Sequence, residues 1–130
     1  MKKVLLVEDS ATQAAKTRLD LEAKGFTVEI AYDGTSALSK VDQWQPDVII
    51  LDYLLPDING IEVCRTLKQN PLYRTIPIVV FSVEGKLRNM TMAYSAGADS
   101  YVVKGREGDN VLEILVESII ARKNRLRKYN

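Results

Sequence analysis

Short runs of apolar, mostly β-branched residues recur along the chain and predict the strands of a sheet. The clearest run is Val48–Leu51, where four consecutive apolar residues indicate a strand buried on both faces, as in a parallel sheet covered by helices. Weak alternation at Thr27–Ala31 is typical of an edge strand. Three further strands are predicted at Lys3–Val7, Ile78–Phe81 and Tyr101–Val103.

Between these runs, apolar residues recur at the spacing of amphipathic helices. Ser10 or Thr12 is expected to cap the first helix, which has Leu19 on its apolar face and ends before Gly25. Asp33-Gly34 is interpreted as a turn that precedes a second helix. That helix runs through Trp44, and three more are predicted at Ile61–Gln69, at Lys86–Ala96 and from about Asp109 onward.

Strands that alternate with helices predict an α/β fold with right-handed crossovers and helices on both faces of a parallel sheet. We expect a doubly wound, five-stranded sheet of order 2-1-3-4-5 with five helices. The length of 130 residues and the apolar content of 46% suit one globular domain over residues 1–130.

The composition of the chain excludes several classes of function. A formal charge of +1 gives no overall attraction to nucleic acid or acidic membranes, and no run approaches the ~18 apolar residues of a membrane span. The amino terminus enters a strand without the features of a secretory signal, so we expect a cytoplasmic protein. One cysteine and no histidine exclude intrachain disulfides, Cys/His zinc sites and Ser-His or Cys-His catalysis. Any metal must be held by oxygen atoms.

Polar residues follow four of the predicted strands directly, and they are Glu8 with Asp9, Asp52, Ser82 and Lys104. The carboxyl ends of parallel strands meet at one edge, and the first and third strands are neighbours in this order, so Asp9 and Asp52 are expected to face each other. At ~4 Å and an effective dielectric of ~20, each pair of like charges costs about 4 kcal/mol. A divalent cation relieves this repulsion, and oxygen ligands suit Mg²⁺ or Mn²⁺.

Asp52 then becomes a candidate nucleophile toward phosphorus, because carboxylates form aspartyl phosphates. Lys104 and Ser82 would contact the phosphoryl oxygens, and such positioning and charge stabilisation is what phosphoryl transfer requires.

The motifs VLLVEDS, VIILDYLLPDINGIE, VVFSVEG and AGADSYVVKG resemble those of bacterial two-component response-regulator receiver domains, which have a flavodoxin-like fold. The resemblance runs from about Lys3 to Ile120. It implies that Asp52 accepts a phosphoryl group from a phosphohistidine and that Ser82 is a switch hydroxyl. It also implies that Tyr101 is an aromatic residue that turns inward on activation. Lys104 matches the lysine that is invariant in the family. The implied metal ligands are the acids Glu8 and Asp9, the phosphoacceptor Asp52 and the main-chain carbonyl of Leu54.

The resemblance also implies the partners. A sensor histidine kinase or phosphotransfer protein would supply the phosphoryl group, and an output protein or domain would read the face made by the fourth helix, fifth strand and fifth helix. The only catalysis expected is the domain's own aspartyl phosphorylation and dephosphorylation. We expect no membrane contact and no direct binding of nucleic acid, and the sequence leaves homodimerisation open.

Two residues depart from the family pattern. Gly105 stands where the family usually has proline, which leaves the loop after Lys104 less constrained. Val83 stands where the family favours alanine or glycine, and with Leu54 it is expected to narrow access and slow phosphoryl exchange. These departures leave open an interaction module that works without phosphorylation. A phosphohydrolase is disfavoured, because Leu54 occupies the position of its second acid.

Some residues have plainer interpretations. Asp57 and Asn59 are expected to shape their loop and cap the helix that follows, and Cys64 is expected to pack on a helix face. The basic residues of the segment 122–130 suit the solvated carboxyl end of a helix, with nucleic-acid binding as a weaker alternative. Leu126 keeps the phase of Ile119, which leaves open that this helix leads to an output domain.

Overall fold

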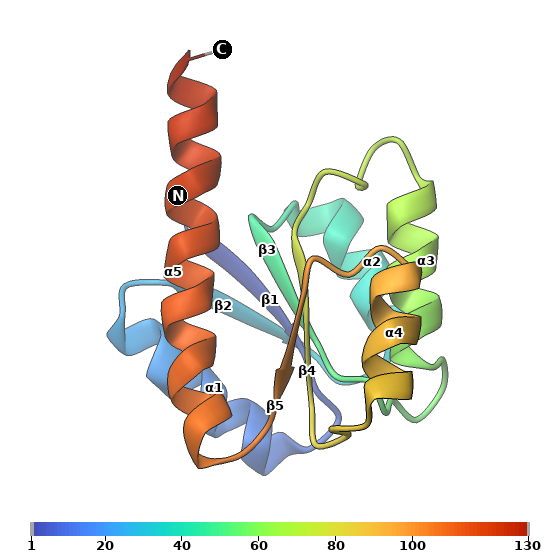
Figure 1. Ribbon diagram of the computed structural model, residues 1–130. Coiled ribbons are helices and arrows are strands. Elements are labelled where there is room, and N and C mark those ends of the chain that lie inside the picture. The colour runs from blue at the N-terminus through green and yellow to red at the C-terminus, as the bar shows by residue number, and fades with distance from the viewer. Residues whose placement is uncertain (1, 130) are drawn as a thin grey trace.

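The structure, a computed structural model, describes residues 2–129, with side chains described for residues 2–105 and 107–126. A twisted parallel sheet lies at its centre, with α1 and α5 on one face and α2, α3 and α4 on the other (Figure 1). The strand order β2-β1-β3-β4-β5 confirms the predicted doubly wound, flavodoxin-like α/β fold. The strands are β1 (Lys3–Val7), β2 (Thr27–Ala31), β3 (Val48–Leu51), β4 (Ile78–Ser82) and β5 (Ser100–Val103).

The five predicted helices are present, with small differences at their ends. They are α1 (Ala11–Ala23), α2 (Gly34–Trp44), α3 (Gly60–Gln69), α4 (Leu87–Ser95) and α5 (Arg106–Tyr129). Ser10, one of the two predicted caps, accepts a hydrogen bond from the main-chain N–H of Gln13 and so begins α1.

Alternate residues of each strand supply two separate cores. Leu5 and Val7 of β1 pack with α2, α3 and α4, whereas Val4 and Leu6 pack with α1 and α5. The strands of the sheet centre are therefore buried on both faces, as the run at Val48–Leu51 predicted. This double cover leaves the carboxyl edge of the sheet as the place where strand ends can meet a ligand.

Expectations about single residues of α1, α2 and α5 are wrong. Leu19 is 67% exposed, and the buried residues of α1 are Ala14 and Leu21. Gly34 is the first residue of α2 and not part of a separate turn, because Asp33 caps the helix at once by accepting from the main-chain N–H of Ser36. Helix α5 begins before Asp109, whose N–H already donates to the carbonyl of Gly105, 2.8 Å away.

The loop after β3 is fixed by two caps on different helices. Asn59 caps α3, as predicted, by accepting from the N–H of Ile61 at 2.8 Å. Asp57 was assigned to the same helix, and this was wrong: it accepts from the main-chain N–H groups of Gly34 and Thr35 and from the Thr35 hydroxyl. The hydroxyl bond, with the main-chain bonds, holds the pKa of Asp57 well below its usual range.

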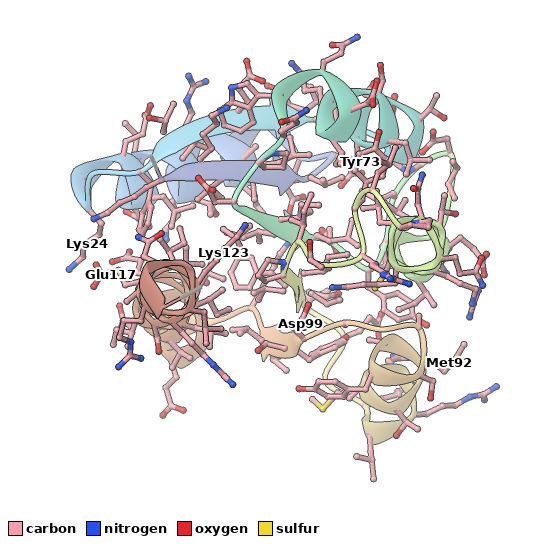
Figure 2. The ribbon with its side chains drawn as sticks, turned by 90° about the horizontal axis from the view of Figure 1, so that it is seen from above. Lys24, Tyr73, Met92, Asp99, Glu117 and Lys123 are labelled. Atoms are coloured by element: carbon pink, nitrogen blue, oxygen red, sulfur yellow. The ribbon has the colours of Figure 1, made fainter. Side chains whose placement is uncertain are left out.

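Helix α5 extends past the sheet (Figure 1). Arg122 and Arg125 are exposed there, as expected of a solvated basic helix end. Lys123 instead extends from α5 toward the sheet (Figure 2), where its Nζ donates to the carbonyl of Asp47. Arg127 and Lys128, which belong to the same basic segment 122–130, lie outside the described side chains. Among the described residues, no helix has the length and apolar character needed to span a bilayer.

Candidate functional site

The ends of β1, β3, β4 and β5 bring the predicted polar residues to one edge of the sheet. Val7 pairs with Leu51, so the following residues Glu8 and Asp52 leave their strands side by side. The ladder continues past the strand ends, because the N–H of Asp52 donates to the Val7 carbonyl and the N–H of Lys104 to the Ser82 carbonyl. These main-chain bonds hold the side chains in register.

Three carboxylates converge at this edge. Glu8, Asp9 and Asp52 each place a carboxylate oxygen within 4.8 Å of the other two. Glu8 and Asp52 are buried, with 4% and 7% of their surface exposed, whereas Asp9 is exposed. Burial is the main reason that the pKa of Glu8 is raised, and the hydrogen bond from Lys104 opposes that rise. The sequence prediction that these acids meet is confirmed by the geometry.

Lys104 neutralises part of this charge. Its Nζ donates to Asp52 Oδ2 at 2.8 Å and to Glu8 Oε2, and it lies 5.6 Å from the centre of the Phe81 ring. Burial disfavours the ammonium, but the hydrogen bonds to Asp52 and Glu8 outweigh it and raise the pKa of Lys104. The third acceptor is Gln13 Oε1 at 2.8 Å, a contact that the sequence analysis did not anticipate. The cluster keeps an excess of two negative charges when all its groups are ionised.

The chemistry of the donor set fits a hard divalent cation. The carboxylates of Glu8, Asp9 and Asp52 supply oxygen atoms alone, and Mg²⁺ and Mn²⁺ prefer such ligands. The exposure of Asp9 leaves one side of the cluster open to solvent, which suits Mg²⁺ because it usually keeps several waters.

Ser82 and Tyr101 both contact the main chain of Glu84, in the loop after β4. The buried Ser82 Oγ accepts from the N–H of Glu84 at 3.3 Å. The Tyr101 hydroxyl donates to the Glu84 carbonyl at 2.6 Å, and burial raises the pKa of this phenol. The two predicted switch residues are thus connected through one peptide segment.

The loop after Asp52 approaches the chain closely. A Cβ at Gly60 would lie 2.2 Å from the carbonyl oxygen of Asp52, so only glycine fits where this loop enters α3. The N–H of Leu54 donates to Asp52 Oδ1 at 3.1 Å and fixes the second carboxylate oxygen. Leu54 and Val83 are 51% and 61% exposed. Their predicted effect on access to Asp52 stays a prediction.

Residues 4–116 match the family described as the response regulator receiver domain. The chain belongs to this family. The family places it in phosphorylation-based, two-component signalling, and receiver domains typically bind Mg²⁺ in an acidic pocket such as the one formed by Glu8, Asp9 and Asp52. It is a signalling domain and not a classical enzyme.

Two relatives and one solved structure illustrate the similarity. The phosphate regulon transcriptional regulatory protein PhoB of Rhizobium meliloti (strain 1021) is 37% identical over 102 residues, or 78% of this chain and 45% of that protein. The DNA-binding response regulator MtrA of Mycolicibacterium paratuberculosis is 34% identical over 102 residues, covering 78% and 44%. A two-component response regulator from Clostridium difficile superposes with a TM-score of 0.87 at 26% identity, covering 95% of this chain and 99% of that one. The chain spans about half the length of the curated relatives it matches.

Proposed function

We propose that this receiver domain accepts a phosphoryl group on Asp52 from the phosphohistidine of a sensor histidine kinase or phosphotransfer protein. The observation that carries the proposal is the contact between Lys104 Nζ and Asp52 Oδ2 within the cluster of Glu8, Asp9 and Asp52. The Lys104 ammonium offers positive charge to the incoming phosphoryl group, and the carboxylates offer ligands for a divalent cation that would supply more.

In the proposed reaction a carboxylate oxygen of Asp52 attacks phosphorus. The O–P bond forms as the P–N bond to the donor imidazole breaks, and the bond's electron pair stays on the imidazole nitrogen, which takes a proton from solvent. Lys104 and Ser82 orient the phosphoryl oxygens by donating hydrogen bonds. Mg²⁺, or Mn²⁺ in its place, would be held by Glu8, Asp9, Asp52 and the Leu54 carbonyl and would supply further positive charge.

The contacts of Glu84 suggest how the signal leaves the site. Ser82 Oγ now accepts from the Glu84 N–H, and a phosphoryl group on Asp52 would draw the hydroxyl away as its donor partner. The loop then releases the Tyr101 hydroxyl from the Glu84 carbonyl, and the ring turns inward. We propose that this changes the face formed by α4, β5 and α5, as a population shift between two states.

We further propose that the output lies in a partner protein or in a separate domain that follows α5. Two relatives of about twice the matched length carry the names transcriptional regulatory protein and DNA-binding response regulator. Any DNA binding in this system is assigned to such an output unit, because the receiver's own charge is close to neutral.

The test of the proposed function is intact mass after incubation with acetyl phosphate and Mg²⁺. The wild-type chain is expected to gain an adduct of about 80 Da, the mass of one phosphoryl group on an aspartate. Asp52→Asn and a sample stripped of divalent metal should gain none. An adduct that persists in Asp52→Asn would move the acceptor to another residue. No adduct in the wild type, also with a phosphoramidate donor, would favour the module that works without phosphorylation.

A further inference from the structure

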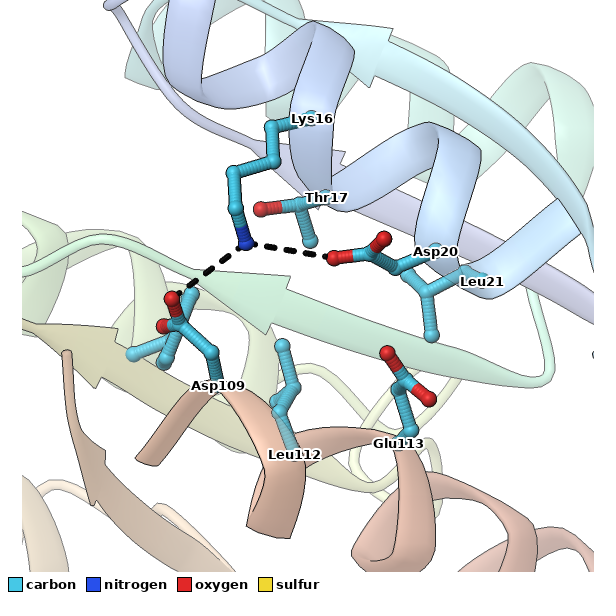
Figure 3. A pocket seen from close by; sticks show the side chains of 8 residues that line it. Lys16, Thr17, Asp20, Leu21, Asp109, Leu112 and Glu113 are labelled. Carbon is cyan, nitrogen blue, oxygen red and sulfur yellow. Dashed lines mark hydrogen bonds and ion pairs between the residues drawn. The ribbon is translucent and has the colours of Figure 1, made fainter. Parts of the chain in front are cut away.

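Helix α1 contacts the segment that carries Lys104 at two points. Near its start, Gln13 Oε1 accepts from Lys104 Nζ at 2.8 Å. One turn later, Lys16 Nζ lies 3.3 Å from both Asp20 Oδ2 and Asp109 Oδ2, and so joins α1 to the first turn of α5 (Figure 3). Both contacts connect residues more than 90 positions apart in the sequence.

We propose that Gln13 is a positioning residue that holds the Lys104 ammonium over Asp52 during phosphoryl transfer. This rests on the proposed function of Asp52. An ammonium has three N–H donors, and here its three acceptors are Asp52, Glu8 and Gln13. Gln13 is the one neutral acceptor, so its own charge does not change when Asp52 is phosphorylated. It occupies one donor and directs the other two toward the carboxylates.

Gln13 is itself held in place by a cyclic network of hydrogen bonds. The Ser10 N–H donates to Glu8 Oε1 at 3.2 Å, and the Gln13 N–H donates to Ser10 Oγ at 3.3 Å. Gln13 then accepts from Lys104, which also donates to Glu8. The cap that starts α1 is therefore part of the same network as the buried acid, and the glutamine is held at its backbone as well as at its amide.

Helix α1 contacts both sides of the loop that follows Lys104. Gly105 has a φ of +145°, in the region that L side chains rarely adopt and that proline cannot reach. A Cβ at this position would meet nothing within 4 Å, so a side chain at residue 105 would have no neighbour to pack on. Where proline would stiffen the chain, α1 restrains it through Gln13 at Lys104 and Lys16 at Asp109.

Gln13 also lines a groove of about 320 Å³ together with Val83, Lys104 and Gly105. A residue in this groove could act by touching the phosphodonor directly, and the experiment must separate that role from positioning. A positioning role acts through Lys104 and is the same for every donor. A donor contact depends on the leaving group and persists when Lys104 is removed.

The experiment measures initial rates of phosphorylation with acetyl phosphate and with phosphoramidate, in the presence of Mg²⁺. The chains compared are the wild type, Gln13→Met, Lys104→Ala and the double variant. Loss of a hydrogen bond to a charged group should slow Gln13→Met about tenfold with either donor. In the Lys104→Ala background, the same substitution should change the rate by less than about twofold, because its partner is gone. Gln43→Met is the matched control and should keep the wild-type rate, since Gln43 is also an exposed helical glutamine, bonded to Ser39 on α2.

Three results would overturn the proposal: a wild-type rate in Gln13→Met, slowing that differs between the donors, or equal slowing with and without Lys104. None of these touches the proposed function, which fails only if the wild-type chain takes no phosphoryl group on Asp52. In that event, the ¹⁵N-edited NMR signal of the Lys104 ammonium still tests whether Gln13 positions this group. Its hydrogen exchange should be about tenfold faster in Gln13→Met, and equal exchange in both chains would refute the positioning role.

Discussion

Two lysine clusters lie at opposite ends of β5 and use the same chemical groups differently. Before the strand, Lys68 Nζ donates to Asp99 Oδ2 at 2.9 Å and to the carbonyls of Arg74 and Ile76. Asp99 in turn accepts from the Ile78 N–H. After the strand, Lys104 faces both Glu8 and Asp52, with Asp9 close by. The first cluster pairs one cation with one anion and main-chain groups, whereas the second holds more acid than base.

This difference in charge balance separates a structural tie from a chemical site. The Lys68 cluster fastens α3 to the start of β4 and β5, and it is neutral as it stands. The Lys104 cluster has an excess of negative charge, and two of its three acids, Glu8 and Asp52, are buried, a condition that is costly unless a cation is added. In this protein, the cluster whose charges do not balance is the candidate chemical site, and the neutral ion pair has a structural role.

Among the changes considered, removing Lys104 should have the largest effect on the free energy of unfolding. Lys104→Met leaves Glu8 and Asp52 buried without their cation, and we expect the free energy of unfolding in metal-free buffer to fall by about 3 kcal/mol. Urea denaturation followed by circular dichroism measures the loss. Asp52→Asn in the same background should recover part of it, because one uncompensated charge is removed. No recovery would mean that packing, and not charge, is the cause.

Adding Mg²⁺ should affect only the acid-rich cluster. At a Mg²⁺ concentration ten times the dissociation constant, the stability should rise by about 1.4 kcal/mol. Asp9→Asn should reduce this gain, because Asp9 is the exposed member of the three acids and a proposed ligand. Thermal unfolding with and without Mg²⁺ measures both. Asp99→Asn serves as the control from the balanced cluster and should keep the full gain. An undiminished gain in Asp9→Asn would place the ion elsewhere.

Removing Lys68 should have a smaller effect that is independent of metal. Lys68→Met keeps the aliphatic stem that packs on Gly97 but loses the hydrogen bonds to Ile76 and Asp99. The Asp99 side chain is 47% exposed and regains water, so we expect a loss of about 1 kcal/mol. The Mg²⁺ gain and the phosphorylation rate should match the wild type. A changed phosphorylation rate would show that the two ends of β5 are coupled.

The sequence predicted the fold and the convergence of the polar residues at the strand ends, because both follow from local patterns. The apolar runs located the strands, and Glu8, Asp52, Ser82 and Lys104 follow or end those runs directly. Since parallel strands end at one edge, their convergence followed from the topology.

The unpredicted contacts join segments far apart in the sequence. Gln13 and Lys104 are 91 residues apart, and Lys68 and Asp99 are 31 apart. Such pairs depend on how each helix lies against the sheet, and the periodicity of a helix fixes which face is buried but not where its ends reach. The bond from Thr35 to Asp57 was missed for the same reason, because local patterns assigned Asp57 to the next helix.

The smallest effect is expected at Asp57. It is an acid near the carboxyl edge of the sheet, but its hydrogen-bond partners are neutral. Its pKa is lowered on folding from the model-peptide value of 3.8, so its contribution to stability is present above that pH and is lost as the pH falls further. Asp57→Asn keeps an acceptor oxygen but loses the charge, and we expect its melting temperature to be slightly below the wild type at pH 7. The gap should narrow progressively as the pH of both chains is lowered below 3.8. The Mg²⁺ gain should not change. A gap of constant size across this range would mean that the Asp57 caps act by geometry alone, without the charge that sets apart the cluster at Lys104.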